Sequence, residues 1–475
     1  MSNENKFKYL AKNTVLFTIC SFGSKLITFF LVPLYTKVLS TSEYGIADLI
    51  TTSVMLCGYL FTLDIESAVL RFGIDKRENT ASVLNFSLWI VLKGSIIFGV
   101  GVFVFSGLSN IGWPSYCYIY MFIYYFVSRV NGVLANYLRA VDKVKFVAIG
   151  GLIATAATIG SNLIFLLVFG LGLSGYLLSL TIGSVASTLY QVIAIDTPLK
   201  RIIQCKSEKT ERTAMIKYST PLIFNGVAWW INNSLDKYFI TVLIGTAANG
   251  IYSIAYKIPT MMVMVQSVFN QAWNLSAIKE FDRNDSDGFF GKTYNTYNAC
   301  LVVFSSLLII FNKMIARFLF AYDFFEAWHY APLLVVATLF SAMAGFIGSI
   351  FSAAKDSKIF AISTVSTAVI NTIINSLLIP AMGIYGAAIG TLAAFNLIWL
   401  IRLICSKRYI CMQIHIFKDV LIYIILIIQA VCAIFFDSLI FVQLGLFNVI
   451  ILAYIKELRE MFQKLFKLSN YVKIV

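Results

Sequence analysis

Basic and polar side chains recur inside segments that are otherwise almost wholly apolar, and their chemistry demands partners. One helical face of the segment 10–32 carries such residues at spacings of four and three: Thr14, Thr18, Ser21, Lys25 and Thr28. Lys25 follows the start of this segment by about 22 Å at the rise of an α-helix. If the segment crosses a membrane, its ammonium group is too deep to reach the surface easily. A charge at such depth is expensive unless it faces an internal polar cavity, so we expect Lys25 to line one.

The same argument applies to Arg129, within 115–138, and to Lys257, within 250–275. We expect at least two of these three cations to line a central cavity. Amide and carboxyl side chains that we assign to the same cavity are Asn225, Asn232, Asp236, Asn270, Asn371 and Asn375. An alternative for the amides is hydrogen bonding between helices, which is common in membrane bundles.

Two carboxylates near the end of the segment 45–68, Asp64 and Glu66, leave two interpretations open. They can pair with Arg71 at the end of the segment. Alternatively, they can bind a coupling ion, as carboxylates inside membrane helices often do.

The composition explains why these polar residues are surrounded by apolar ones. Of the 475 residues, 59% are hydrophobic and 13% are charged, whereas soluble domains carry about 25% charged residues. The long apolar segments predict an all-α integral membrane protein rather than a β-barrel. The net charge of +14 could indicate nucleic-acid binding. Basic cytoplasmic loops explain it better, and we expect no nucleic-acid partner.

About fourteen segments are long and apolar enough to span a bilayer. They are roughly 10–32, 45–68, 83–106, 115–138, 146–168, 172–195, 218–243, 250–275, 294–316, 328–352, 358–380, 384–404, 417–436 and 438–455. Alternate connections are basic, including the one from Arg402 to Lys418, whereas the opposite side carries only Lys37, Lys313 and Arg317. By the positive-inside rule both termini are cytoplasmic. The first segment reads as an uncleaved span, because no signal-peptidase site of the A-x-A type precedes Pro33.

A weak internal repeat divides the first twelve spans into halves. Gly45-Ile46 aligns with Gly250-Ile251, and the sequence GLSG at 172–175 matches GIYG at 383–386. Six spans per half give both halves the same orientation. We therefore predict two six-helix lobes around a central cavity, 1–210 and 211–410. Two accessory, lipid-facing helices and a cytoplasmic tail follow at 411–475.

Enzymatic and metal-binding patterns are missing from the sequence. The 8 cysteines include no CxxC pair and the two histidines are isolated, so we expect neither a metal site nor a cofactor. The segment Gly291-Lys292-Thr293 is no Walker A motif, because Ser286 stands where the first glycine is required. The outward loops are short, which argues against a membrane-embedded glycan polymerase or ligase. We predict that the chain is not an enzyme.

Four short stretches resemble the opening of bacterial polysaccharide repeat-unit flippases. They are GSK at 23–25, PLYTK at 33–37, YGIADL at 44–49 and LRFG at 70–73. A fifth, IPAMGIYGAA at 379–388, is similar to a sequence that recurs across the multidrug/oligosaccharidyl-lipid/polysaccharide (MOP) superfamily. The resemblance covers about spans 1 to 12.

The resemblance implies a substrate, a direction and a place. A glycan on undecaprenyl pyrophosphate would move from the inner to the outer leaflet of the bacterial cytoplasmic membrane by alternating access. This export serves O-antigen or capsule synthesis, and a polysaccharide polymerase is a candidate partner. Lys25 lies in one of the matching stretches, whereas the assignment of Arg129 and Lys257 to the site depends only on their depth in the predicted spans. These cations could replace the hydration of the pyrophosphate.

Two other transport functions stay open at this point. A multidrug exporter of the same superfamily would favour cavity carboxylates that hold cationic drugs. A flippase for the peptidoglycan precursor would carry a related lipid-linked substrate.

Overall fold

The computed structural model describes residues 22–75, 80–108, 112–205, 207–354, 356–436 and 440–472, which contain helices and no strand. Contacts divide the chain into two compact units: unit 1 ends at Ser234, and unit 2 begins at Leu235. This division falls inside a helix, about two dozen residues after the predicted lobe boundary at 210. The three predicted domains, 1–210, 211–410 and 411–475, stay predictions.

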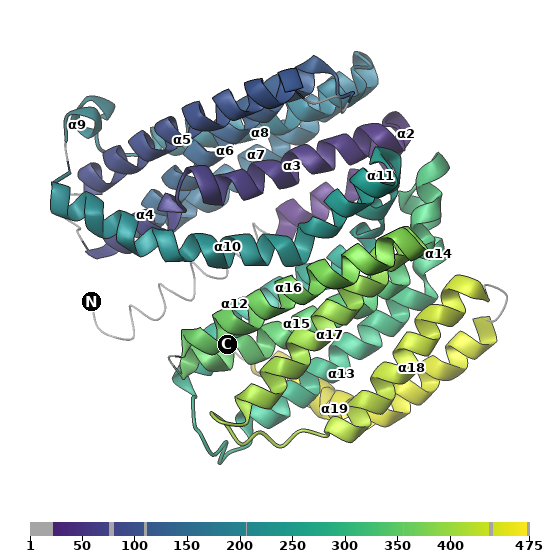
Figure 1. Cartoon of the computed structure of the whole chain (residues 1–475). Helices are drawn as coiled ribbons and strands as arrows, with labels where there is room; N and C mark the ends of the chain where they lie inside the picture. Colours follow the sequence, from purple (N-terminus) through teal and green to yellow (C-terminus); the bar gives the residue numbers. More distant parts are fainter. Residues whose placement is uncertain are drawn as a thin grey trace. The chain divides into compact units, whose positions relative to one another are not determined.

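Unit 1 is a bundle of helices that follow one another with short connections (Figure 1). Residues 22–30 are helical and lead into the first complete helix. The helices are then α2 (Val32–Val38), α3 (Thr41–Phe61), α4 (Ile65–Asp75), α5 (Thr80–Leu108), α6 (Ser115–Ala140), α7 (Val144–Asn162) with a π-helical continuation (Leu163–Val168), α8 (Gly172–Ile193), α9 (Leu199–Gln204) and α10 (Lys209–Leu243), which passes into unit 2.

Unit 2 continues with α11 (Thr246–Ala255), α12 (Lys257–Lys279), α13 (Phe289–Ile310), α14 (Asn312–Leu319), a 3₁₀ segment (Tyr322–His329), α15 (Ala331–Ala353), α16 (Ser357–Met382), α17 (Ile384–Ser406), α18 (Ile416–Phe435) and α19 (Ile440–Val472). Its core forms around α15, which is almost entirely buried and packs against α12, α13, α16, α17 and α18. The core of unit 1 lies where α6 packs against α4, α5 and α8.

Ten helices of the described residues are long and apolar enough to cross a membrane. They correspond to ten of the predicted spans, so the chain is a multi-pass membrane protein. The other predicted spans correspond to 22–30 with α2, to α6, to part of α10, and to α11 with α12. These are the spans that carry Lys25, Arg129, Asp236 and Lys257, so the candidate charges concentrate in the less apolar helices.

Several predicted spans are divided between two helices, as 294–316 is between α13 and α14, and two of these breaks lie beside candidate residues. The sequence analysis leaves the segment 45–68 unbroken, but the structure divides it between α3 and α4. In 250–275, α11 ends at Ala255 and α12 begins at Lys257, with Pro259 in the first turn. A proline there predicts a break, since its ring and missing N–H disfavour a continuous helix. That break does occur.

The residues of the internal repeat occupy equivalent helix starts. Ser40 precedes the first residue of α3, and its repeat partner Gly245 precedes the first residue of α11. Gly172 opens α8 and Gly383 precedes α17, and both have positive φ, 52° and 61°. Glycine adopts this conformation without the strain that a Cβ would add.

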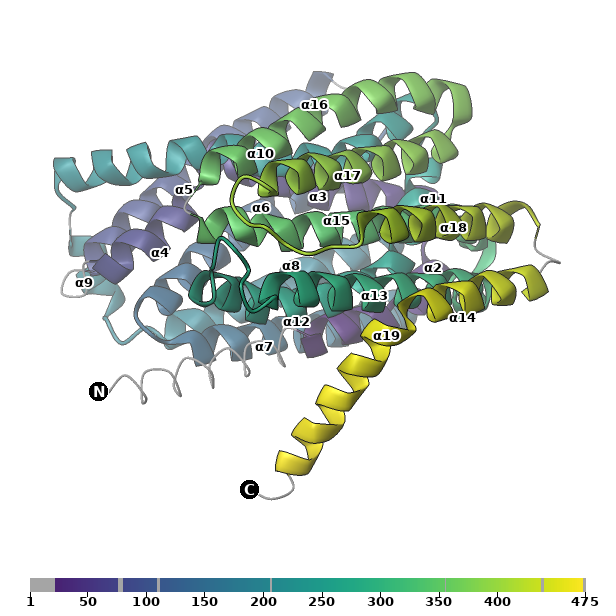
Figure 2. The ribbon, with the colours of Figure 1, turned by 90° about the horizontal axis from the view of Figure 1, so that it is seen from below.

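The two C-terminal helices face outward on one side and join a buried polar network on the other. Asp419 of α18 is 1% exposed and accepts a hydrogen bond from Tyr454 Oη of α19 at 2.7 Å. Asn298 of α13 donates to Tyr454 at 3.1 Å and accepts from Tyr423 of α18 at 2.7 Å. The sequence analysis did not anticipate this network, which fastens α18 and α19 to α13. Beyond it, α19 extends away from the other helices of unit 2 (Figure 2).

Candidate substrate and ion-coupling sites

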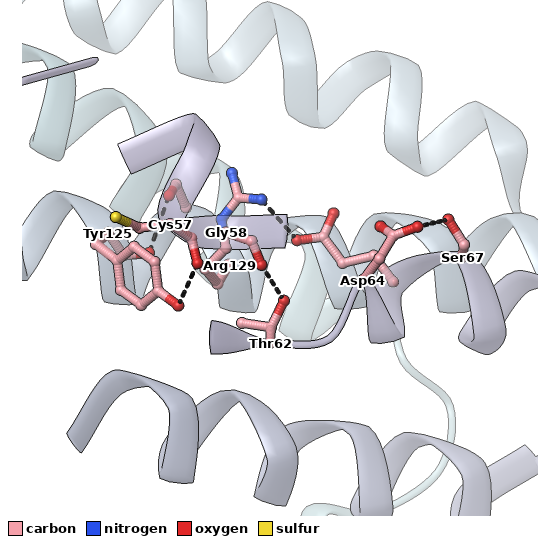
Figure 3. A network of polar contacts seen from close by, with 9 residues as sticks. Cys57, Gly58, Thr62, Asp64, Ser67, Tyr125 and Arg129 are labelled. Atoms are coloured by element: carbon pink, nitrogen blue, oxygen red, sulfur yellow. Dashed lines mark hydrogen bonds and ion pairs between the residues drawn. The ribbon is translucent and has the colours of Figure 1, made fainter. Parts of the chain in front are cut away.

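The break between α3 and α4 determines where two carboxylates of unit 1 lie (Figure 3). Leu63 and Asp64 have positive φ of 54° and 47°, which is uncommon for residues with a Cβ. Thr62 Oγ1 donates to the carbonyl oxygen of Gly58 at 2.7 Å, at the end of α3. Ser67 Oγ donates to Asp64 Oδ2 at 2.8 Å, at the start of α4. The turn leaves Glu66 in the first turn of α4, from which it reaches α6.

Glu66 forms an ion pair with Arg129 of α6 inside unit 1. The Arg129 Nη1 atom lies 3.1 Å from Glu66 Oε1, and each side chain is 20% exposed. Two glycines leave room for the pair. A Cβ at Gly58 would lie 2.5 Å from Arg129 Nη1, and a Cβ at Gly132 would lie 2.3 Å from Glu66 Oε2. The pair therefore depends on small residues in both facing helices.

The guanidinium of Arg129 keeps an unused donor. Its Nε is buried and has no hydrogen-bond partner among the described residues. Since a guanidinium offers five N–H donors in a fixed plane, an oxygen-rich ligand could bind beside Glu66.

The structure shows which carboxylate pairs with Arg71, a question that the sequence leaves open. Arg71 Nη2 lies 3.5 Å from Asp75 Oδ2, one turn further along α4. Glu66 pairs with Arg129 instead, so the prediction that Glu66 pairs with Arg71 is wrong. Ion coupling through Asp64 and Glu66 stays a proposal.

Unit 2 contains a second buried carboxylate at the C-terminal end of α10. Asp236 is 1% exposed, and its Oδ2 accepts hydrogen bonds from Tyr252 Oη at 2.5 Å and from Thr391 Oγ1 at 3.2 Å. The Lys237 backbone N–H donates to Oδ1 at 2.9 Å. These bonds join α10, α11 and α17. The Lys237 ammonium group lies 5.9 Å from the ring centroid of Tyr256, at the break before α12. Consecutive residues of α10 thus carry a buried carboxylate and a cation.

Two of the candidate amides lie between helices. Asn371 and Asn375 of α16 are fully buried, and Asn375 Nδ2 donates to Asn371 Oδ1 at 3.0 Å. A Cβ at Gly390 of α17 would lie 2.3 Å from Asn375 Oδ1. This close packing favours the interpretation that Asn371 and Asn375 connect helices.

Asn270 lies in a similar row. On α12 it follows Gln266 by four residues, and both amides lie near Gly345 of α15. Asn232 is buried and donates to the carbonyl oxygen of Ala228 at 3.0 Å, within its own helix. Asn225 is exposed, so it is the candidate amide most available to a ligand.

The predicted cations lie in different units. Lys25, in the helical residues 22–30, and Arg129 belong to unit 1, whereas Lys257, the first residue of α12, belongs to unit 2. Lys25 and Lys257 are half-buried. Of the polar face predicted around Lys25, the structure describes Thr28, while residues 14–21 lie outside the described residues. That all three cations share one cavity stays a prediction.

Arg402 corrects the sequence analysis, which counts it among the basic residues of a connection. The structure places it inside α17, where it is 4% exposed. It donates to the Ala344 carbonyl oxygen at 2.9 Å, to Ser363 Oγ at 3.1 Å and to Thr364 Oγ1 at 3.0 Å. Its guanidinium carbon lies 4.3 Å from the ring centroid of Phe360. This buried cation therefore joins α15, α16 and α17 through neutral acceptors.

The sequence model of one protein family, described as "Polysaccharide biosynthesis protein", matches residues 10–274, more than half of the chain. The chain belongs to the polysaccharide biosynthesis protein family. The match includes unit 1 with the Arg129–Glu66 pair, and it extends through Asp236 and Lys257. It confirms the family resemblance found in the sequence motifs.

Other proteins are similar to this family member over most of its length. An uncharacterized membrane protein of Methanocaldococcus jannaschii is 20% identical over 422 residues, which is 84% of this chain and 98% of that protein. The lipid II flippase MurJ, in an inward closed conformation, is similar in structure with a TM-score of 0.66. It is 17% identical, and the alignment covers 95% of this chain and 100% of MurJ.

A multidrug resistance transporter of the MATE family and MOP superfamily, in an inward-facing conformation, is also similar in structure. The TM-score is 0.65 at 12% identity, over 81% of this chain and 94% of the transporter. These likenesses show that the family member has the fold of MOP-superfamily transporters.

Proposed function

We propose that this protein moves lipid-linked oligosaccharide repeat units from the inner to the outer leaflet of the bacterial cytoplasmic membrane. The substrate is a glycan on undecaprenyl pyrophosphate, destined for a surface polysaccharide such as O-antigen or capsule. The observation that carries the proposal is the match to the polysaccharide biosynthesis protein family over more than half of the chain. A polysaccharide polymerase on the outer side is a candidate partner.

Charge recognition of the substrate begins at Arg129. Its Nη1 is held by Glu66, and its Nε has no partner among the described residues. A pyrophosphate oxygen that accepts from this guanidinium would form a charge-assisted hydrogen bond, which is stronger than a neutral one. Lys25 and Lys257 are the further cations that we assign to the pyrophosphate. The exposed amide of Asn225 is suited to sugar hydroxyl groups.

The Arg129–Glu66 pair gives a physical route to coupling. Protonation of Glu66 would remove its charge and release Arg129 for the anionic substrate. Deprotonation would restore the pair and weaken the hold on the substrate. Asp64, two residues away, would take part because it shares the break between α3 and α4. The membrane potential adds to this, since outward movement of an anion gains about 2.3 kcal/mol per charge at 100 mV, inside negative.

Two alternative functions are each supported by a similar solved structure. The likeness to a MATE transporter, together with the buried Asp236, fits a multidrug exporter that holds cations. The likeness to MurJ fits a flippase for the peptidoglycan precursor. Both would work by the same alternating access, so the substrate is what separates them.

The decisive experiment deletes the gene in its own host and measures two pools. If the proposal holds, surface polysaccharide is lost and lipid-linked oligosaccharide accumulates in the cytoplasmic membrane. Unchanged pools with increased drug sensitivity would favour the multidrug exporter. Accumulation of the peptidoglycan precursor would favour the flippase for that precursor. Flipping in vesicles that is indifferent to potential and to ion gradients would remove the coupling scheme.

A further inference from the structure

A groove in unit 2 is separate from the candidate sites described above. It has a volume of about 680 Å³ and is lined by α12, α13 and α19 together with the loop before α13. Its long wall is one face of α13, from Phe289 to Phe304. At 1.5 Å per residue this wall is about 22 Å long. The groove therefore follows α13 from the loop before its first turn along most of its length.

The polarity of the groove changes along its length. At the start of α13 the lining includes Asp287, Lys292 and Thr293. Farther along it consists of apolar groups such as Leu301 and Phe304. A groove that is charged at the membrane surface and apolar toward the middle matches an amphiphile with one headgroup and a hydrocarbon chain.

Aromatic rings make the deep part rigid. Phe269 of α12 stacks on Tyr297 of α13 with ring centroids 3.9 Å apart, and both line the groove. On the other side Cys300 Sγ lies 3.2 Å from Met461 Sδ of α19. The groove is thus closed by side chains from three helices, and a chain bound in it would contact all of them.

The charges at the mouth discriminate between headgroups. Lys292 Nζ donates to the Asp287 carbonyl oxygen at 3.0 Å, so an ammonium group and a carboxylate-bearing residue share the mouth. The first N–H groups of α13 are already bonded: Phe289 N donates to Asp287 Oδ1, and Phe290 N and Gly291 N donate to the Asp285 carboxylate. A doubly anionic headgroup would meet two carboxylates here and find these helix N–H donors occupied. A headgroup with one phosphate and one amine fits, with its phosphate on Lys292 and its amine on Asp287.

We propose that this groove binds a membrane phospholipid whose headgroup carries both a phosphate and an amine. Its chain lies along α13 and its headgroup lies at the 280–288 loop, which the positive-inside pattern places on the cytoplasmic side. The bound lipid fastens α19 to α13 and is distinct from the transported substrate.

The test compares two variants of neighbouring valines on α12. Val265 lines the groove and is 46% exposed, whereas Val263 is 41% exposed and does not line it. Val265→Trp fills the groove with a large ring, and Val263→Trp adds the same bulk elsewhere. Native mass spectrometry of the full chain in detergent measures lipid retention, with phosphatidylethanolamine and phosphatidylglycerol offered in equal amounts.

The wild type and Val263→Trp should retain the ethanolamine lipid at least about tenfold better than the glycerol lipid, which corresponds to about 1.4 kcal/mol. Val265→Trp should lose that retention. Equal retention by both tryptophan variants would overturn the groove assignment. A preference for phosphatidylglycerol, or for an added prenyl phosphate, would overturn the headgroup assignment.

Lys292→Ala provides a second test that introduces no bulk. Lys292 is exposed and lies at the loop, so its removal should leave the fold intact. The proposal requires that this variant retain both lipids more weakly, because both carry the phosphate that Lys292 binds, while Asp287 still favours the ethanolamine lipid. Unchanged retention of both lipids would remove Lys292 from the site, and with it the proposed arrangement of the headgroup.

Discussion

Arg129 Nη1 of α6 and Glu66 Oε1, in the first turn of α4, lie 3.1 Å apart in unit 1. The helix α4 begins where the predicted span 45–68 is broken. The pair joins a candidate substrate cation to a candidate coupling carboxylate. In the proposed mechanism this one contact links substrate binding to energy coupling, and variants of either residue can test it.

Variants that neutralise Arg129, Glu66 or both can separate the effect of the pair on stability from its effect on transport. Glu66→Gln should destabilise the protein by about 3 kcal/mol, because Arg129 is left as an uncompensated charge. Arg129→Gln should abolish export. The double variant Glu66→Gln/Arg129→Gln should recover stability but not export. Thermal unfolding in detergent and surface polysaccharide in the deletion host measure the two effects. Arg71→Gln serves as the control, since Arg71 lies at an exposed pair. Normal export by the double variant would remove Arg129 from the site.

The two glycines beside the pair offer a change that leaves every charge in place. Alanine at Gly132 or at Gly58 would push a flexible side-chain end rather than backbone, so the helices can keep their positions. We expect export to fall about tenfold, which is a cost of about 1.4 kcal/mol in the transition state. Stability should change by no more than about 1 kcal/mol.

Gly151→Ala is the matched control for these glycines, because a Cβ at Gly151 meets nothing within 4 Å. It should export normally. Equal losses in Gly151→Ala and Gly132→Ala would mean that helix flexibility, not the geometry of the pair, causes the defect.

Removing one hydroxyl tests the buried carboxylate of unit 2. Tyr252→Phe deletes the donor that lies 2.5 Å from Asp236 Oδ2. Asp236 Oδ2 keeps the bond from Thr391 Oγ1. Loss of the shorter bond to this buried acceptor should still cost about 1 kcal/mol, so the unfolding temperature should fall. Tyr322→Phe is the control, since Tyr322 is 79% exposed. If both variants unfold at the same temperature, Tyr252 does not stabilise unit 2 through Asp236.

A loop carboxylate predicts a dependence of stability on pH. Asp356, before α16, accepts a hydrogen bond from Tyr409 Oη at 2.5 Å, and this bond holds its pKa below the ordinary value of 3.8. The folded state therefore releases this proton more readily than the unfolded state does. The stabilisation is complete above pH 3.8 and is lost as the pH falls through the lowered folded pKa.

Thermal unfolding between about pH 2 and pH 5 measures this loss. Tyr409→Phe should raise the pKa of Asp356 in the folded state, so that the loss of stability is smaller and is complete at a higher pH. Asp356→Asn should remove this contribution to the pH dependence altogether. An identical pH profile in the wild type and Tyr409→Phe would show that the hydroxyl does not hold the carboxylate.

The sequence predicts the spans of this protein well, because hydrophobic length determines them. It also predicts the break beside Pro259, since the cause is local to one residue. The break at Thr62 has no such local cause: Leu63 and Asp64 adopt positive φ without glycine. The partner of Glu66 could not be predicted either, because Arg129 is far away in sequence and only the packing of α4 on α6 brings them together.

For the amides, the sequence does not predict what their helical face contacts. Four-residue spacing correctly puts Asn371 and Asn375 on one face of a helix, but spacing does not say whether that face meets a cavity or another helix. Gly390 on α17 favours contact with another helix, because its lack of a side chain lets the helices approach. For Arg402 the sequence position near the end of a span suggested a loop. The acceptors on α15 and α16 that bury it become evident only in the assembled unit.

The burial of Arg402 has a consequence for how the chain is made. Before the helices assemble, a long side chain near the end of α17 can extend to the membrane surface, where a positive charge helps to set the orientation of the newly inserted segment. Once α15 and α16 are in place, Ala344, Ser363 and Thr364 accept its donors inside the bundle. During biosynthesis Arg402 can thus help to orient α17, and in the folded protein it holds three helices together. The final position of α17 therefore depends on α15 and α16, which are inserted before it.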